Sequence, residues 1–434
     1  MTGDNELKYL RHPNATDGMA PVAVRAGDLI FVGGQMAVHP ESGVPDETRL
    51  HPGMPHHGSL IEKQLRYLYG NLVDWLPELG TSLKHIMKIN SFHIHSEDID
   101  MALRERRNWF SHEDPPPSTL VFTPALTARD ARVLIDLINV ADDATLPMTP
   151  VALTKSPPIA QVKSIGWAVF SQVIKGGGLV FTRGTTAHNQ DGPLPETQAD
   201  YPFPYAVNQV QFQLRYELER MKDLLEDAGC TLSDVVRAEL HMTDMTDLAA
   251  VDEVWNEYFP VDPPARVIIP VPLVFLKNTM RIESEFIAVD PKGPFKKEVI
   301  NVDGVPPRLG PEAHAVKAGP YVFISGQMAT DFENGLATEA QGDPNFPFHS
   351  TPAKLQAEYV IKNVEKICQA AGTSINNLVK RRVHHTDLKD TPNAEAAWKE
   401  NLGNQIPPTS VFQTSGPLPV PDCSVQYDLI AYAP

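Results

Sequence analysis

Tyr321-Val-Phe-Ile-Ser-Gly-Gln327 is the most informative stretch of this chain, because a run of β-branched and aromatic residues ends there in a glycine turn. The same arrangement occurs twice earlier, as Leu29-Ile-Phe-Val-Gly-Gly-Gln35 and Leu179-Val-Phe-Thr-Arg-Gly-Thr185. The matching glycines are 150 and then 142 residues apart: Gly34, Gly184 and Gly326. Self-similarity at a nearly fixed period is the sequence signature of a repeat architecture. The 434 residues are therefore expected to contain three diverged copies of one domain.

A second landmark repeats with nearly the same period. Apolar residues at helical spacing predict an amphipathic helix in each copy, over residues 60–79, 209–228 and 352–371. Each helix stops at a glycine, the residue expected at a left-handed C-cap, and these glycines are 149 and 143 residues apart: Gly80, Gly229 and Gly372.

The rest of each copy continues the same order of elements. A strand, a second helix containing a Trp, a double-proline turn and two closing strands follow each cap glycine. Each copy therefore reads β-β-α-β-α-β-β, which is an α+β domain. Proline-rich linkers near residues 144–158 and 290–307 place the domains at residues 1–145, 158–292 and 305–434.

A sheet that carries helices on one face must bury its other face against something. Three copies in one chain can supply that cover to one another. We therefore expect an intramolecular pseudo-trimer with the sheets at the centre, the helices outside and three clefts between neighbouring repeats. Further pairing of such pseudo-trimers is left open.

Composition and charge narrow the classes of partner. A formal net charge of −17 without a strong basic cluster argues against a nucleic-acid partner. The apolar stretches are too short to span a bilayer. The three cysteines are far apart, and the N-terminus lacks an apolar segment, so a reduced, cytoplasmic setting is expected. No phosphate loop, dinucleotide fingerprint or histidine metal motif is present, so no metal site is predicted.

Three motifs carry a resemblance to a known family. Ile324-Ser-Gly-Gln327, Pro263-Pro-Ala-Arg266 and the stretch from Arg281 to Val289 resemble the signature of the RidA/YjgF family in order and spacing. The resemblance covers nearly the whole chain from about Gly18 onward, and it implies three chorismate-mutase-like domains. Members of this family are generally homotrimers with ligand clefts at the subunit interfaces. Many hydrolyse reactive enamines or imines to ketones and ammonia, without a metal or organic cofactor.

The resemblance also implies site residues. The family's substrate-binding arginine corresponds to Arg266, whose guanidinium suits bidentate binding of a substrate carboxylate. Ser118 and Thr409 take that place in repeats one and three, so those clefts lack the arginine. An acid that could orient or deprotonate the attacking water is implied at the last strand of each copy: Asp136, Glu285 and Asp428.

Two further family positions vary among the copies. The serine before Gly-Gln is Ser325 in repeat three, whereas Gly33 and Arg183 replace it in the other copies. The family's tyrosine position holds Ala20, Phe170 and Glu312 in repeats one, two and three. We expect Phe170 to contact the substrate. If Arg183 and Arg266 faced one cleft together with Glu285, that cleft would suit a dianionic substrate.

Histidines on the middle strand offer a different chemistry. His93 and His385 occupy equivalent positions and could act as general bases near neutral pH, although packed histidines are a simpler interpretation. Combined with the hydroxyls, they would give Ser118/His93/Asp136 in repeat one and Thr409/His385/Asp428 in repeat three. Such sets would describe an amide or ring-opening hydrolase.

Each copy also has a long loop before its first helix, at residues 44–58, 193–206 and 336–350. Proline-stiffened aromatic loops are candidates for lids or substrate walls, or for packing between the repeats.

The sequence as a whole predicts a hydrolase that acts on a C–N bond of a small, carboxylated metabolite with water as the nucleophile. The Ser/Thr-His-Asp hydrolase and a non-catalytic metabolite-binding protein are the alternatives.

Overall fold

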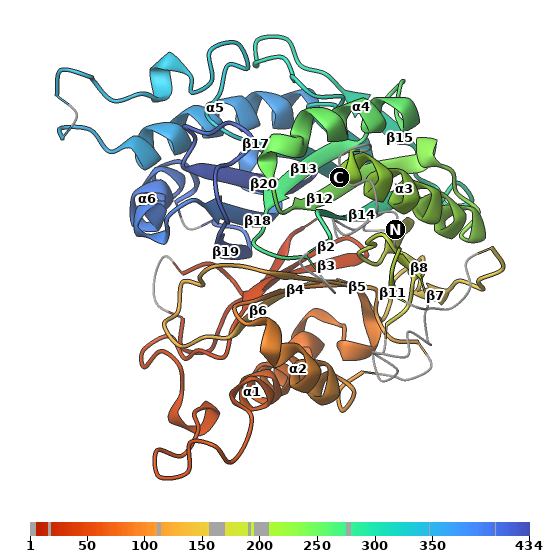
Figure 1. Ribbon diagram of the computed structural model, residues 1–434, viewed down its shortest axis with the longest axis vertical. Coiled ribbons are helices and arrows are strands. Elements are labelled where there is room, and N and C mark those ends of the chain that lie inside the picture. Colours follow the sequence, from red (N-terminus) through yellow and green to blue (C-terminus); the bar gives the residue numbers. More distant parts are fainter. Residues whose placement is uncertain are drawn as a thin grey trace.

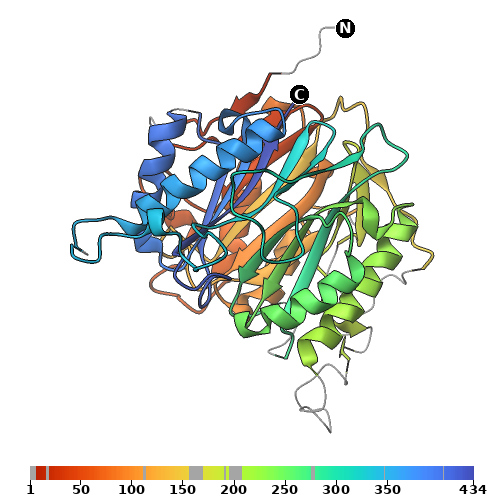
Figure 2. The same cartoon turned by 90° about the horizontal axis from the view of Figure 1, so that it is seen from above.

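The computed structural model describes residues 6–15, 19–110, 114–155, 170–189, 192–194, 208–274, 279–346, 348–403 and 405–434. Three six-stranded sheets face one another at the centre, and the helices lie outside them (Figures 1 and 2). Repeat one lies at the bottom of Figure 1, with repeats two and three above it. The predicted α+β pseudo-trimer is confirmed.

Repeat one shows the architecture that all three copies share. Its sheet has the order β1-β2-β3-β6-β4-β5, in which only β4 and β5 run parallel. The long helices pack on the outer face of the sheet. The elements are β1 (Lys8–Leu10), β2 (Ala23–Ala26), β3 (Leu29–Gln35), α1 (Leu60–Trp75), β4 (Ile86–His93), α2 (Ile99–Arg106), β5 (Ser118–Phe122) and β6 (Val133–Val140).

Repeats two and three follow the same order. Repeat two also has a two-stranded ribbon, β10 (His188–Asn189) with β11 (Gly192–Pro193). Its main elements are β7 (Thr149–Pro150), β8 (Val173–Gly176), β9 (Leu179–Thr182), α3 (Gln209–Asp227), β12 (Val235–Met242), α4 (Leu248–Tyr258), β13 (Ala265–Pro270) and β14 (Ile282–Val289). Those of repeat three are β15 (Lys297–Ile300), β16 (Ala315–Ala318), β17 (Tyr321–Gln327), α5 (Pro352–Ala370), β18 (Leu378–His385), α6 (Thr391–Leu402), β19 (Thr409–Gln413) and β20 (Val425–Tyr432).

One strand per repeat was not predicted. β1, β7 and β15 each add an edge to their own sheet, and the last two lie in stretches that the sequence suggested were linkers. Strands of two to four residues are too short to show a period of two in the sequence.

The cap glycines have the expected backbone conformation. Gly80, Gly229 and Gly372 have φ values of 71°, 78° and 82°, in the left-handed region that glycine adopts without steric cost. In repeat one, a short 3₁₀ turn (Leu76–Leu79) separates the end of α1 from its glycine.

The centre of the molecule is apolar and is built by all three repeats. Phe31, Phe181 and Phe323 occupy equivalent positions and belong to one buried cluster. Each lies three residues before its repeat's turn glycine. The inner faces of the sheets therefore bury one another, as closure of the ring requires. Within the described ranges, no helix combines the length and the apolar character needed to cross a bilayer.

Candidate functional site

Three seams join neighbouring repeats. The first seam lies between repeats one and two, where β4 and β5 meet β9; the second lies between repeats two and three, where β12 and β13 meet β17. The third seam closes the ring, where β18 and β19 meet β3.

The seams bring together the motif positions that the family resemblance picks out in neighbouring copies. At the first seam, the Gly184 N–H donates to the Ser118 carbonyl at 3.0 Å. At the second seam, the Arg266 N–H donates to Ser325 Oγ at 2.9 Å. At the third seam, a Cβ added to Gly33 would lie 2.7 Å from the Thr409 nitrogen, so the two backbones are in direct contact.

A cyclic set of buried ion pairs crosses all three seams. Lys88 Nζ lies 2.9 Å from Glu285 Oε2, Arg237 Nη2 lies 2.5 Å from Asp428 Oδ2, and Lys380 Nζ lies 2.8 Å from Asp136 Oδ1. Each base lies eight residues after its cap glycine, and each acid lies on the last strand of the next repeat. We call these six residues the ion-pair ring.

The ion-pair ring changes the interpretation of Asp136. Its two oxygens accept four hydrogen bonds, one from Lys380, two from Arg382 and one from Ser410. Burial opposes ionisation, but the Arg382 and Lys380 charges outweigh it and lower the pKa of Asp136 to about 2. A carboxylate has about four acceptor sites, so Asp136 has none left to orient a water. These contacts do not support the catalytic role predicted for Asp136.

Glu285 and Asp428 differ from Asp136 because only one oxygen of each carboxylate accepts hydrogen bonds from the described residues. Lys88 and the Asn90 amide both bind Oε2 of Glu285, whereas Oε1 accepts no hydrogen bond from the described residues. Asp428 pairs with Arg237 through Oδ2, and its Oδ1 is buried without a partner in the described part of the chain. Glu285 therefore keeps one oxygen that could bind a water at the first seam.

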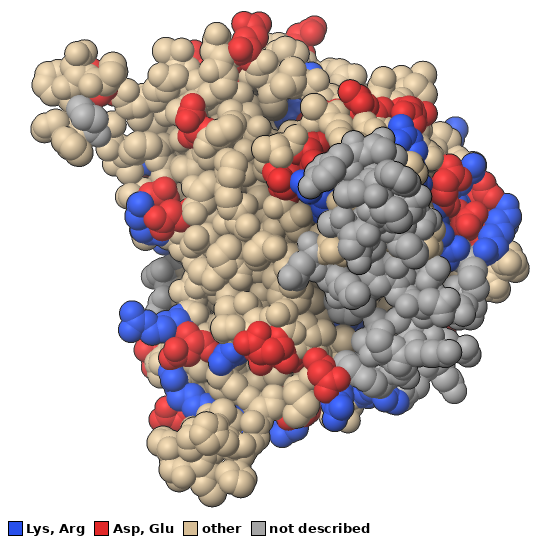
Figure 3. Space-filling model, in the orientation of Figure 1, with Lys and Arg blue, Asp and Glu red and all other residues tan. Residues whose placement is uncertain are grey.

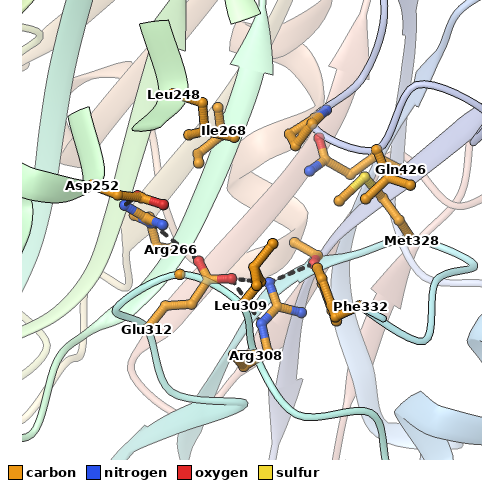
Figure 4. A pocket seen from close by; sticks show the side chains of 14 residues that line it. Leu248, Asp252, Arg266, Ile268, Arg308, Leu309, Glu312, Met328, Phe332 and Gln426 are labelled. Carbon is orange, nitrogen blue, oxygen red and sulfur yellow. Dashed lines mark hydrogen bonds and ion pairs between the residues drawn. The ribbon is translucent and has the colours of Figure 1, made fainter. Parts of the chain in front are cut away.

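Arg266 lies at the second seam, where its charge is already neutralised. Nη1 lies 2.6 Å from Asp252 Oδ1 and Nε lies 3.1 Å from Glu312 Oε2, while Arg308 also pairs with Glu312 (Figure 4). A cavity of about 60 Å³ adjoins these residues. Drug-sized ligands fill about 300–1,000 Å³, so this space suits only a very small molecule.

Arg183, Arg266 and Glu285 do not share one cleft, so the condition for a dianionic substrate is not met. Arg183 follows β9 beside the first seam, where its guanidinium lies 6.0 Å from the Phe170 ring and donates to the Gly184 carbonyl. Glu285 also belongs to the first seam, through Lys88. Arg266 lies on the opposite side of repeat two, because β13 and β9 are at different places in the sheet.

The histidines are packed core residues. His93 and His385 are both buried at the ends of their strands. Burial, together with the Arg106 charge, lowers the pKa of His93 to about 3, and burial lowers that of His385 to about 4. Both are neutral at pH 7.

Neither Ser/Thr-His-Asp set is assembled. Ser118 Oγ accepts a hydrogen bond from Arg106, and Thr409 Oγ1 accepts one from Arg381. The acids Asp136 and Asp428 belong to the ion-pair ring. No hydrogen bond among the described residues links the members of either set, so the geometry does not support the alternative hydrolase.

Two arginines at the seams were missed by the sequence analysis. Arg106 of α2 and Arg381 of β18 reach the hydroxyls that replace the family arginine, at 2.7 Å and 3.2 Å. The signal was present in the sequence only as unremarkable basic runs on a helix and a strand.

The long loops do not pack between the repeats at their tips. Residues 44–58, 336–346 and 348–350 project from the body of the molecule (Figure 1), and Met54 and Phe348 are exposed. Most of the loop at 193–206 lies outside the described residues. Within the described ranges, no group of three or more His, Cys, Asp and Glu residues is placed to hold a metal ion.

Comparison with known proteins agrees with the threefold architecture. The family model described as Endoribonuclease L-PSP matches residues 10–141, 163–290 and 306–433. A RutC family protein of Pyrococcus abyssi is 32% identical over 136 residues, which are 31% of this chain and 97% of that protein. Reactive Intermediate Deaminase A, a chloroplastic protein of Arabidopsis thaliana, is 29% identical over 136 residues, or 31% of this chain and 66% of that protein.

A solved structure, RidA from an Antarctic Psychrobacter species, is 34% identical and has a TM-score of 0.26. It covers 31% of this chain and 98% of its own chain. Because the family model matches three times and spans most of the sequence, this chain belongs to the RidA/YjgF family as three tandem copies in one polypeptide.

Proposed function

We propose that the protein is a hydrolytic deaminase that converts a small, carboxylated imine or enamine to a ketone and ammonia. Its homologues, which include a reactive intermediate deaminase, support an imine- or enamine-deaminase-like role. The reaction site is the first seam, and the protein works as a single-chain pseudo-trimer without a metal or organic cofactor. We place it in the cytoplasm.

One observation carries the choice of the first seam. Glu285 is held there by Lys88 and Asn90 through one oxygen, while its other oxygen has no partner among the described residues. A fixed carboxylate with one available oxygen can accept a proton from a water and orient it toward an electrophilic carbon. The corresponding acid at the third seam, Asp136, has no such oxygen, and the unpartnered oxygen of Asp428 at the second seam is fully buried.

The chemistry needs only water. Water oxygen adds to the C=N carbon of the imine, and the π electrons move to nitrogen to give a carbinolamine. Glu285 takes a proton from the water and returns one to nitrogen. The hydroxyl proton then passes to nitrogen through Glu285, and the C–N bond breaks as the C=O bond forms, so that a 2-imino acid and water yield a 2-oxo acid and ammonia.

An endoribonuclease role, which the description of the family model names, receives no support from the charge of the chain. A net charge of −17 opposes binding of a polyanion. On the face shown in Figure 3, the basic side chains are interspersed with acidic ones and form no continuous patch. We therefore propose a small-molecule substrate.

The test is the release of ammonia from 2-iminopropanoate, generated in situ from alanine by an amino acid oxidase. Decay of the imine is followed by its competition with semicarbazide. We expect Glu285→Gln to lower the enzymatic rate by about 10²-fold or more, the range for loss of a general base. Asp136→Asn, a matched change in the ion-pair ring, should keep the activity of its folded fraction within about fivefold of wild type.

Two outcomes would contradict the proposal. If the wild-type protein binds pyruvate but does not accelerate decay of the imine, it is a metabolite-binding protein. If both variants lose activity equally, Glu285 acts only as a member of the ion-pair ring.

A further inference from the structure

We propose that Arg106 binds the carboxylate of the substrate at the first seam, in place of the arginine that repeat one lacks at Ser118. The identity of the substrate as a carboxylated imine rests on the proposed function. Binding of a small carboxylate by Arg106 does not, and it can be tested separately.

Each repeat places one guanidinium at an equivalent location beside an aromatic ring, although the arginines come from different elements. Arg106 lies 5.2 Å from the Phe110 ring, Arg266 lies 5.5 Å from Trp255, and Arg381 lies 5.1 Å from Trp398. Arg106 and Arg381 also donate to the hydroxyls that stand at the Arg266 position in their repeats. The three seams thus keep a buried cation where the motif arginine was lost twice.

The three guanidinium groups differ in their carboxylate partners. Arg266 pairs with Asp252 and Glu312, and Arg381 Nη2 lies 2.6 Å from Glu395 Oε2. Arg106 has no carboxylate partner among the described residues, and its Nε and Nη2 are buried without a hydrogen bond.

An unpaired buried guanidinium is costly, so its presence calls for an explanation. Arg106 is only 6% exposed, and burial lowers the pKa of its guanidinium, which nonetheless stays charged at neutral pH. Buried charges are almost always paired, because an uncompensated one loses its hydration without a Coulombic return. An anion from outside the chain would supply the missing partner.

The unpaired edge of Arg106 presents the two donors that a carboxylate requires. Nε and Nη2 form the edge through which Arg66 binds both oxygens of Glu105, at 3.2 Å and 2.8 Å. Arg215 binds Glu257 through the same two atoms. The free edge of Arg106 can therefore take one planar carboxylate in the same bidentate manner.

The surroundings indicate a monoanion with a small apolar remainder. Leu103, Leu120 and Phe122 form a buried cluster between α2 and β5, and Leu273 of repeat two packs against it. His93, which is neutral at pH 7, adds no second charge. A dianionic ligand would leave its second charge without a described partner beside Arg106.

The experiment uses pyruvate as the probe and isothermal titration calorimetry of the full chain. We expect one site in the wild-type protein, at least a tenfold loss of affinity in Arg106→Met, and a smaller loss in Arg106→Lys. Arg381→Lys, a matched change at a cation that already has Glu395, should leave the affinity within about twofold. Unchanged affinity in Arg106→Met would overturn the inference.

Thermal unfolding without ligand gives an independent readout. Removing an unpaired buried charge should leave the melting temperature of Arg106→Met equal to or above that of wild type. Arg266→Met should lower it, because Asp252 loses its partner and Glu312 keeps only Arg308. If both variants melt equally below wild type, Arg106 has a structural role only. If Arg106→Met loses pyruvate binding but the wild-type protein shows no turnover, the proposed deaminase activity is refuted and the role of Arg106 is not. If Arg106→Met keeps full turnover, the role of Arg106 is refuted and the deaminase activity is not.

Discussion

Lys88 Nζ lies 2.9 Å from Glu285 Oε2 and joins repeats one and two, and an equivalent ion pair crosses each of the other two seams. Each repeat gives a base to the next repeat and receives one from the previous repeat. The ion-pair ring therefore joins each repeat to both of its neighbours, around the apolar cluster that contains Phe31.

The ion-pair ring should be sensitive to loss of one member. Asp136→Asn strands Lys380 and weakens Arg382, and we expect a loss of about 3 kcal/mol or more in the free energy of unfolding. Denaturation in urea, followed by tryptophan fluorescence, measures it. The control is Asp143→Asn, which removes an exposed pair with Arg25 and should cost less than about 1 kcal/mol. Equal effects of the two variants would show that the ring adds nothing to stability.

Gly33 and Gly70 should respond to alanine in opposite directions. A Cβ on Gly33 would meet the Thr409 backbone across the third seam, and such overpacking costs about 1–3 kcal/mol. Gly70 lies inside α1 with nothing within 4 Å of the added carbon, so Gly70→Ala should stabilise by about 0.5–1 kcal/mol. The denaturation midpoints of the two variants measure both changes. A stabilising Gly33→Ala would contradict the close contact at the third seam.

Stability should fall on mild acidification because of buried histidines. The folded-state pKa of His385 is about 4, below its ordinary value of about 6.5. Between these values the unfolded chain binds a proton that the folded chain does not, so stability is full above pH 6.5 and declines as the pH falls toward 4. Each such histidine contributes a slope on the order of 1 kcal/mol per pH unit.

The corresponding variant is His385→Gln, which should flatten the pH dependence of the unfolding free energy between pH 6.5 and 4. His57→Gln, at an exposed position, should leave the profile unchanged. A profile that keeps its wild-type slope in His385→Gln would show that this histidine is not the source.

Freeing Arg266 should create a second carboxylate site. The double variant Asp252→Asn, Glu312→Gln removes both of its carboxylate partners, so the stoichiometry of pyruvate binding should rise from one toward two per chain. Calorimetry at millimolar pyruvate measures this. A stoichiometry that stays at one would show that the cavity at the second seam is too small or that the geometry has changed.

Much of the fold could be predicted because glycines mark its turns. Gly80, Gly229 and Gly372 need the left-handed region, and their spacing located the repeats. The short edge strands were not predicted, because a strand as short as β7 shows no periodicity in the sequence. The ion-pair ring also has a signal in the sequence, since Lys88, Arg237 and Lys380 share one offset from these glycines, but that offset alone does not name their partners.

The candidate site was harder to predict. Ser325 and Arg266 meet at the second seam, which no motif predicted, and Arg266 is paired with Glu312, a residue at the family's tyrosine position. Arg106 reaches Ser118 from a helix, so a comparison of strand motifs could not find it. Which charges remain unpaired depends on side chains brought together by folding, and no spacing in the sequence reports that.

Holding all three repeats on one polypeptide has a consequence for evolution and for dilution. In a ring of identical subunits, a substitution alters every interface at once, whereas here one seam can change while the other two are preserved. Because the repeats are tethered, the first seam stays assembled at concentrations where separate subunits would drift apart. A site built from two repeats can thus operate at trace abundance.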